Sequence, residues 1–376
     1  MIVRSLALMN FRNYEKLEME FSPAVNILFG DNAQGKTNVL EAVYLAGTTK
    51  SHKAAKDREM IRLGEDEAHL RMIVEKEITP GDADAGTEAR TISHKIDMHL
   101  KAGRAKGIAI DGVPVRRSQD LFGMVHMIFF APEDLNMIKS SPGERRRFLD
   151  MEISQVDKIY LHNLTQYNKA LQQRNNLLRQ IAAEEQPKDM LSVWDEQLVR
   201  FGTVVIRERE KFVEKLNVLA SDVHRRLTGG KERLEMVYEP NVKPEDFAGK
   251  LARHGEIDLI QRTTLVGPQR DDIRFMIDGI DIRKFGSQGQ QRTAALSVKL
   301  SEIDLFRAET HEDPVLLLDD VFSELDRNRQ NYLLTSIGDI QTLITCTGLE
   351  EFVSYKKDTG NIYKVVEGTV ERYNGE

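Results

Sequence analysis

The sequence predicts an α/β fold in which antiparallel β hairpins lie beside a parallel core and a helical segment is inserted. Three observations lead to this prediction. Short apolar runs end in a glycine-rich loop or in acidic residues, which is typical of buried parallel strands. Alternating stretches meet at Asp-Gly turns, the pattern of β hairpins. In the middle of the chain, apolar residues recur at a 4-3 spacing, which indicates long helices.

The composition is that of an ordinary globular protein, which excludes collagen-like, low-complexity and membrane-spanning classes. The 376 residues include 53 Lys and Arg and 60 Asp and Glu, giving a formal net charge of −7. Any nucleic-acid surface must therefore be a local basic patch. The single cysteine, Cys346, cannot form an internal disulfide, and the N-terminal residues do not resemble a signal peptide. We expect a cytoplasmic protein that has no membrane partner.

The N-terminal elements are predicted from short patterns. Leu17 to Phe21 alternate between apolar and polar residues, as a half-buried strand does. Val25 to Phe29 form a continuous apolar run, which predicts a buried strand ending at Gly30. An amphipathic helix is expected over residues 38–45.

Two hairpins and a pair of neighbouring strands are also expected. One hairpin turns at Asp111-Gly112 and the other at Asp278-Gly279. Residues 314–318 form an apolar run that ends in Asp319-Asp320, and residues 343–346 are expected to be the neighbouring strand.

The middle of the chain predicts a helical hairpin. Pro187 separates two runs with apolar residues at a 4-3 spacing. The first run contains Tyr160, Leu164, Tyr167, Leu171, Leu178 and Ile181, and the second contains Trp194, Leu198, Phe201, Val205, Phe212 and Leu219. Each arm would be roughly 40 Å long, too short for a coiled-coil stalk. Two core helices of an ordinary α/β domain are the alternative.

The strongest motif is a phosphate-binding loop. Residues 30–37 match GxxxxGKT and lie between a predicted buried strand and a helix, as this loop requires. Its backbone N–H groups would surround a β-phosphate, Lys36 would bridge the β- and γ-phosphates, and the Thr37 hydroxyl would bind Mg²⁺. The alternative is an incidental glycine turn. The candidate nucleotide-binding residues here are Gly30, Asp31, Asn32, Ala33, Gln34, Gly35, Lys36, Thr37 and Asn38.

A phosphate-binding loop needs a second acidic site, and the strand ending at Asp319-Asp320 supplies one. We expect Asp319 to join Thr37 in binding Mg²⁺ and Asp320 to polarise the attacking water. The predicted catalytic residues are thus Lys36, Asp319 and Asp320. Alone, such a run would more often be a strand terminus or a helix cap.

The segment from Ser287 to Thr293 reads SQGQQRT and precedes an Ala- and Leu-rich helix, so Ser287 is a good N-cap. Its position before the strand that ends in Asp319 resembles the signature motif and Walker B motif of ATP-binding-cassette (ABC) ATPases. Residues 323–326 resemble the D-loop of that family. The resemblance implies that Ser287, Gly289 and Gln290 close on the γ-phosphate of ATP held by Lys36 of another copy.

Further blocks resemble the RecF family of bacterial DNA replication and repair proteins. Thr37 and Ser287 are 250 positions apart, which resembles the chromosome-maintenance branch of ABC ATPases rather than a transporter motor. The matching blocks are Asn10–Tyr14, Asn32–Ala42, Ala131–Leu135, Ser141–Asp150, Leu265–Asp272 and Ser287–Thr293.

This resemblance implies an ABC-type P-loop ATPase head with antiparallel β hairpins, formed by residues 1–130 plus 260–376. A short coiled-coil-like helical lobe, residues 131–259, would be inserted. It also implies an ATP- and Mg²⁺-dependent homodimer with weak, DNA-dependent ATPase activity, associated with the nucleoid. Such a dimer would clamp duplex DNA at gaps and junctions and help RecO- and RecR-type proteins load RecA. Arg12 would reach the nucleotide, and Asn32 would lie in the phosphate loop.

The sequence departs from the family pattern in a few places. Gln269 stands where the family usually has His, and Lys53 stands where Arg is common, so a bidentate contact to nucleotide is lost there. No Q-loop glutamine or switch histidine is identified.

The basic clusters that could contact DNA are residues 50–58, 101–106, 145–147 and 225–226. Each is by itself more often a solvated face, and the triplet at 145–147 could instead pair with acidic residues. Rival classes fit less well. A transporter motor needs a shorter signature separation, a nuclease of the OLD type needs an acidic domain after the ATPase core, and a structural chromosome-maintenance protein needs a longer coiled coil.

Overall fold

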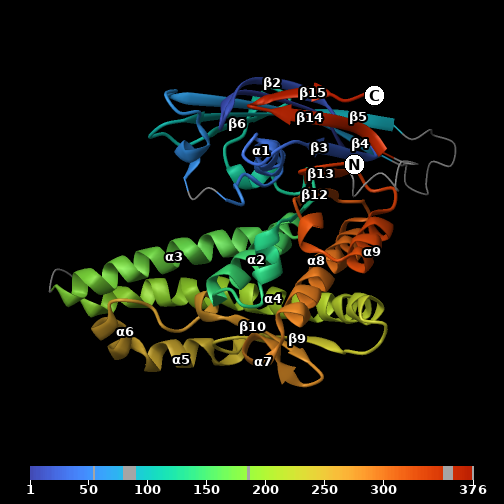
Figure 1. The fold of residues 1–376 in the computed structure, drawn as a ribbon. Coiled ribbons are helices and arrows are strands. Elements are labelled where there is room, and N and C mark those ends of the chain that lie inside the picture. Colours follow the sequence, from blue (N-terminus) through green and yellow to red (C-terminus); the bar gives the residue numbers. More distant parts are fainter. Residues whose placement is uncertain (54–55, 79–89, 184–186, 350–358, 375–376) are drawn as a thin grey trace. The chain divides into compact units, whose positions relative to one another are not determined.

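The computed structural model describes residues 1–53, 56–78, 90–183, 187–349 and 359–374. The chain divides into two compact units (Figure 1): unit 1 comprises residues 1–132 and 306–376, and unit 2 comprises residues 133–305. Among the described residues, no helix combines the length and apolar character that spanning a membrane requires.

Unit 1 contains an antiparallel sheet with the strand order β2-β1-β4-β5-β6-β7. Its strands are β1 (Ile2–Phe11), β2 (Tyr14–Glu20), β4 (Glu67–Ile78), β5 (Arg90–Lys101), β6 (Gly107–Ile110) and β7 (Val113–Pro114). The expected turn at Asp111-Gly112 joins β6 to β7, and both residues have positive φ. The alternation predicted for residues 17–21 is confirmed in β2, where Leu17 and Met19 are buried and the residues beside them are exposed.

The second sheet of unit 1 has the strand order β15-β14-β3-β13-β12-β8. Its strand pairs are parallel except β14 and β15, which are antiparallel. Its strands are β3 (Val25–Phe29), β8 (Met127–Phe130), β12 (Val315–Asp319), β13 (Thr342–Cys346), β14 (Thr359–Val366) and β15 (Thr369–Arg372). Strands β12 and β13 are buried at every position, and β12 reads as a continuous apolar run up to Asp319, whereas β13 also contains Thr342 and Thr345. The predicted strands at 25–29 and 343–346 are confirmed, and β13 lies between β3 and β12.

The helices of unit 1 include α1 (Lys36–Thr48) and α9 (Arg327–Ile337), with 3-10 turns η1 (Asp57–Met60), η2 (Ser118–Leu121) and η7 (Phe322–Glu324). The expectation of an amphipathic helix after the loop is wrong for α1, because most of its residues are buried. The physical reason is that α1 contacts strands of both sheets, including β4 and β12, so it has little solvent-facing surface.

Unit 2 is mainly helical, with a small antiparallel sheet in the order β11-β10-β9. Its helices are α2 (Pro142–Val156), α3 (Lys158–Ala182), α4 (Leu191–Leu227), α5 (Phe247–Arg253), α6 (Gly255–Gln261), α7 (Ile282–Phe285) and most of α8 (Gln288–Thr310). Its strands are β9 (Leu234–Glu239), β10 (Asp272–Ile277) and β11 (Ile280–Asp281), and its 3-10 turns include η3 (Pro132–Asn136), η4 (Lys188–Met190), η5 (Pro244–Asp246) and η6 (Pro268–Arg270).

The predicted helical hairpin is confirmed by α3 and α4, which pack side by side (Figure 1). The second domain boundary differs from the expected position, because residues 260–305 belong to unit 2 rather than to the head. The cause is the pairing of β9 with β10, which ties residues 272–277 to residues 234–239 next to the helical hairpin.

A buried charge network holds the helices of unit 2 together. Arg174 on α3 is fully buried, and its guanidinium donates to Asp195 Oδ1 at 2.5 Å, Asp258 Oδ2 at 2.7 Å and Thr264 Oγ1 at 2.9 Å. Asp258 is also fully buried, and its other oxygen accepts the N–H of Leu265 at 3.0 Å. Removing one partner would leave a buried, unpaired charge, which is costly.

We therefore expect Asp258→Ala to lower the free energy of unfolding of unit 2 by about 3–5 kcal/mol. Lys188→Ala is the control, because its ion pair with Glu256 is exposed and worth at most about 1 kcal/mol. Urea unfolding followed by the fluorescence of Trp194, the single tryptophan, measures both variants. Equal losses in the two variants would contradict a stabilising role for the Arg174 network.

Candidate nucleotide-binding site

The phosphate-binding loop joins the end of β3 to the start of α1, and its two glycines are required by its shape. Gly30 has φ +153°, and a Cβ there would lie 2.3 Å from the carbonyl oxygen of Val365. Gly35 has φ +114°, and a Cβ there would lie 2.5 Å from the Asn13 side chain. Any other residue would therefore force the loop or its neighbours to move.

The turn between β1 and β2 braces one side of this loop. Asn13 Nδ2 donates to the carbonyl oxygen of Gln34 at 2.9 Å, and Asn38 Nδ2 donates to Asn13 Oδ1 at 2.8 Å. The hydroxyl of the buried Tyr14 donates to the carbonyl oxygen of Gly35 at 3.1 Å. These bonds fix the loop backbone before any ligand binds.

The turn between β14 and β15 braces the other side. The N–H of Glu367 donates to Gln34 Oε1 at 2.6 Å, and the N–H of Gly368 donates to the Gln34 carbonyl oxygen at 3.1 Å. Gln34 is thus held from both ends of the chain. The other loop residues, Asp31, Asn32 and Ala33, are exposed, and Ala33 has a positive φ.

Lys36 lies at the first position of α1 with its ammonium group turned back into the loop. Its Nζ donates to the carbonyl oxygens of Gly30 and Asp31, each at 2.7 Å. Burial lowers the pKa of Lys36, and the nearby carboxylates of Asp320 and Asp319 oppose this shift. The ammonium group is therefore positioned inside the loop, where a phosphate oxygen could replace the two carbonyl acceptors.

Asp319 connects the loop to the parallel sheet. Its Oδ1 accepts hydrogen bonds from Thr37 Oγ1 at 2.6 Å and from Thr345 Oγ1 at 2.8 Å. Lys53 Nζ lies 3.5 Å from Asp319 Oδ2. The structure thus brings together the two residues predicted to bind Mg²⁺, a hydroxyl and a carboxylate, which are the oxygen donors that this ion prefers.

Asp320 follows at the carboxyl end of β12 in a left-handed conformation, φ +52°. Its N–H donates to Thr345 Oγ1 at 3.0 Å, and its carbonyl oxygen accepts from Ser323 Oγ at 2.8 Å. Burial raises the pKa of Asp320, and the negative charge of Asp319 raises it further. A carboxylate with a raised pKa is a better proton acceptor, which suits a residue that activates water.

Arg12 pairs with Glu41, a partner that the resemblance does not name. Its Nε and Nη2 donate to the two carboxylate oxygens of the buried Glu41, each at 2.7 Å, and its Nη1 donates to the Glu59 carbonyl oxygen. The hydrogen bond to Glu41 raises the pKa of Arg12. Glu41 also accepts a short hydrogen bond from Ser51 Oγ. A contact between Arg12 and nucleotide stays a prediction.

The signature residues lie at the start of α8 in unit 2. Ser287 and Gln290 form a reciprocal cap: Gln290 N donates to Ser287 Oγ at 3.2 Å, and Ser287 N donates to Gln290 Oε1 at 2.9 Å. Gln290 Nε2 also donates to Glu232 Oε1 at 3.0 Å. A Cβ on Gly289 would have Ser287 Oγ, 3.9 Å away, as its nearest neighbour among the described residues.

The two departures from the family pattern have different surroundings. Lys53 lies beside Asp319 in unit 1, so its charge is kept near the predicted metal ligands. Gln269 is in unit 2, where Tyr167 donates a short hydrogen bond to its Oε1. Its Nε2 donates to the carbonyl oxygens of Thr264 and Val266, each at 3.2 Å, so Gln269 ties its own turn to α3.

Acidic residues of unit 2 form ion pairs with arginines of two basic clusters, residues 145–147 and 225–226. Arg145, buried on α2, makes a bidentate pair with Asp272 at 2.6 and 3.0 Å, so this arginine is structural and not a DNA-facing residue. Arg225 and Arg226 both pair with Asp222.

Sequence reasoning assigned no role to several residues that shape the site. Asn13 and Tyr14 belong to a block that resembles the RecF family, and Glu41 follows the loop motif by four positions. Thr345 could have been found, because carboxyl ends of adjacent parallel strands meet at one edge. The bracing by Glu367 and Gly368 has no local sequence signal.

The chain matches known proteins over nearly its whole length. The family model described as RecF/RecN/SMC N terminal domain matches residues 2–370. The chain is 56% identical to the DNA replication and repair protein RecF of Lachnoclostridium phytofermentans, over 99% of this chain and 100% of that protein. It is 54% identical to the protein of the same name from Agathobacter rectalis, over 99% of each chain.

Solved structures show the same fold. The structure of the recombination mediator protein RecF with ATP, described as part of the RecFOR pathway, has a TM-score of 0.88 and 35% identity, covering 99% of this chain and 97% of that one. An Smc head domain of Pyrococcus furiosus, covering 99% of this chain and 95% of that one, matches at 15% identity with a TM-score of 0.55. The expected ABC-type head is thus confirmed as the fold, and the chain belongs to the RecF family.

Proposed function

We propose that this protein is an ATP-dependent DNA-binding protein of recombinational repair and replication, acting with RecO- and RecR-type proteins in the RecFOR pathway. ATP would join two copies into a dimer that clamps duplex DNA at gaps and junctions, and weak, DNA-dependent hydrolysis would reopen it. The observation that carries the proposal is the hydrogen bond between Thr37 and Asp319, which unites the loop with the acidic strand end. The relatives' names and the RecF structure with ATP supply the biological setting.

Each residue of the nucleotide site would have a distinct role. Lys36 would bind the β- and γ-phosphates, and Thr37 and Asp319 would hold Mg²⁺, which neutralises charge on the phosphate oxygens. Asp320, whose pKa is raised, would accept a proton from the attacking water. Asn32 and the other loop residues would contribute backbone N–H groups.

The dimer proposal rests on the start of α8. A helix N-terminus carries a partial positive charge and suits a phosphate, so α8 of one copy would approach the ATP held by Lys36 of the other. A helical glycine costs about 0.5–1 kcal/mol relative to alanine, yet Gly289 has room for a side chain. A close approach by nucleotide and a second copy would explain why glycine stands there.

The DNA-related parts of the proposal have a different basis. Preference for gaps and junctions, help in loading RecA, a place in the cytoplasm at the nucleoid and weak hydrolysis all follow from the family resemblance. The net charge of −7 restricts DNA contacts to a local patch.

Lys36→Ala should abolish ATP-dependent dimerisation, because it removes the cation that binds the phosphates. Light scattering with ATP and Mg²⁺ should show the 42.9 kDa wild-type chain doubling in mass and the variant staying monomeric. Lys16→Ala, an exposed lysine on β2 paired with Glu18, is the control and should dimerise normally. A variant that dimerises like the wild type would overturn the assignment of Lys36.

Gly289→Gln and Ser287→Arg should bind ATP with unchanged affinity but should not dimerise, because their side chains would fill the space that a second copy needs. Gly255→Gln is a matched control, since Gly255 also lies in the first turn of a helix of unit 2 and also has room for a Cβ. Nucleotide binding by calorimetry and mass by light scattering separate the two steps. Normal dimers of Gly289→Gln would disprove the trans arrangement.

Lys53→Ala should lower the Mg²⁺ concentration that half-saturates ATP-driven dimerisation by about 2–5-fold, because an ammonium group 3.5 Å from Asp319 competes with the metal ion. Lys50→Ala, an exposed lysine of the same segment, should leave that concentration unchanged. If Lys53→Ala needs more Mg²⁺ than the wild type, the ammonium group assists ligand binding rather than competing with it.

A further inference from the structure

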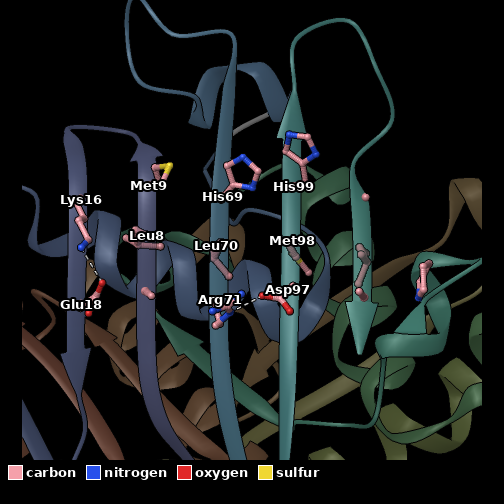
Figure 2. Close-up of a pocket in the computed structure, with 15 residues that line it drawn as sticks. Leu8, Met9, Lys16, Glu18, His69, Leu70, Arg71, Asp97, Met98 and His99 are labelled. Carbon is pink, nitrogen blue, oxygen red and sulfur yellow. Dashed lines mark hydrogen bonds and ion pairs between the residues drawn. The ribbon is translucent and has the colours of Figure 1, made fainter. Parts of the chain in front are cut away.

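A cluster of metal-ligating side chains lies outside the nucleotide site, on the antiparallel sheet of unit 1. Its members are Glu67 and His69 on β4 and His99 on β5. His69 and His99 line one end of a groove of about 610 Å³ whose walls come from β1, β2 and β4 to β7 (Figure 2). Nothing in the proposed ATP chemistry uses them.

The strand register places the three side chains together. Glu67 and His69 are two positions apart on β4, so both project from the same face of the sheet. His99 is the direct cross-strand partner of His69, and such partners have Cβ atoms about 4.5–5.5 Å apart. Figure 2 shows the two imidazole rings next to each other on adjoining strands.

The three ligand atoms lie within 4.8 Å of one another. His99 Nε2 lies 3.2 Å from Glu67 Oε2, and His69 Nε2 lies 3.6 Å from Glu67 Oε1. The rings are stacked with their centroids 4.3 Å apart and their planes 8° apart, so one exposed ring must rotate for both nitrogens to bind the same ion. In a tetrahedral zinc site with bonds of about 2.0–2.1 Å, neighbouring ligand atoms are about 3.4 Å apart, close to both separations.

We propose that Glu67, His69 and His99 form a binding site for a divalent transition-metal ion of the zinc type. Two imidazoles and one carboxylate are a ligand set that zinc uses, with water completing the tetrahedron. The side chains are 42–47% exposed, so an ion can enter from the groove without any unfolding. The ion would join β4 to β5 and thereby stabilise unit 1.

Lys101 competes for the same carboxylate, so a metal ion must displace its ammonium group. It is the cross-strand partner of Glu67, and its Nζ lies 3.1 Å from Glu67 Oε2. The side chain is long and 41% exposed, so a metal ion can displace it into solvent.

Calorimetric titration of the metal-free, nucleotide-free full chain with Zn²⁺ tests the proposal. The wild type should bind one ion, and His69→Ala and His99→Ala should each weaken binding by at least about 10-fold. Lys101→Gln should tighten it by about 2–5-fold, because the competing cation is gone. Co²⁺ should give the intense visible absorption of a tetrahedral site, lost in both histidine variants.

His94→Ala is the matched control. His94 lies on β5 as well and pairs with the carboxylate of Asp111 at 2.8 Å. The proposal predicts that it binds Zn²⁺ as the wild type does and that Zn²⁺ raises the melting temperature of both. A wild type that binds no stoichiometric Zn²⁺, or that loses as much affinity in His94→Ala as in His69→Ala, would overturn the site.

Discussion

The head depends on one carboxylate oxygen, Oδ1 of Asp319, which accepts hydrogen bonds from Thr37 and from Thr345. These three residues come from β12, the start of α1 and β13, so one atom ties together the loop helix and two strands of the parallel sheet. These hydrogen bonds require the strand order β3-β13-β12, because that order brings the carboxyl ends of the three strands to one edge of the sheet. Because α1 is held there between the two sheets, most of its residues are buried, and the loop before it has little freedom.

Around this contact the loop is preorganised by segments distant in sequence. Asn13 and Tyr14 hold it from the turn between β1 and β2, and Gly368 holds it from the turn between β14 and β15. Preorganisation matters because a loop whose N–H groups already point inward binds phosphate without an ordering cost at the moment of binding. The left-handed backbone of Asp320 is a second sign of constraint, since such strain persists where the surrounding structure enforces it.

Local patterns predicted the elements that their own residues determine. The apolar runs at β3 and β12 and the 4-3 spacing of α3 and α4 reflect burial that each segment shows by itself. Contacts between residues far apart in the sequence leave no comparable pattern in the local sequence. The pairing of β9 with β10 places residues 260–305 in unit 2, and the pairing of Arg12 with Glu41 has no local sequence signal. The site was predictable where a motif defines it, at Lys36 and Thr37, and not where tertiary packing supports it.

The central claim is that ATP, held at the Thr37–Asp319 contact, controls DNA binding. Fluorescence anisotropy of a gapped duplex, titrated with the protein in ATP and Mg²⁺, in ADP and without nucleotide, tests it most directly. Thr37→Val, which keeps the shape of the side chain but removes the hydroxyl, is measured beside the wild type. We expect the wild type to bind the duplex tightly only in ATP and Mg²⁺, and Thr37→Val to lose this binding. Equal affinity in all three nucleotide conditions would contradict it.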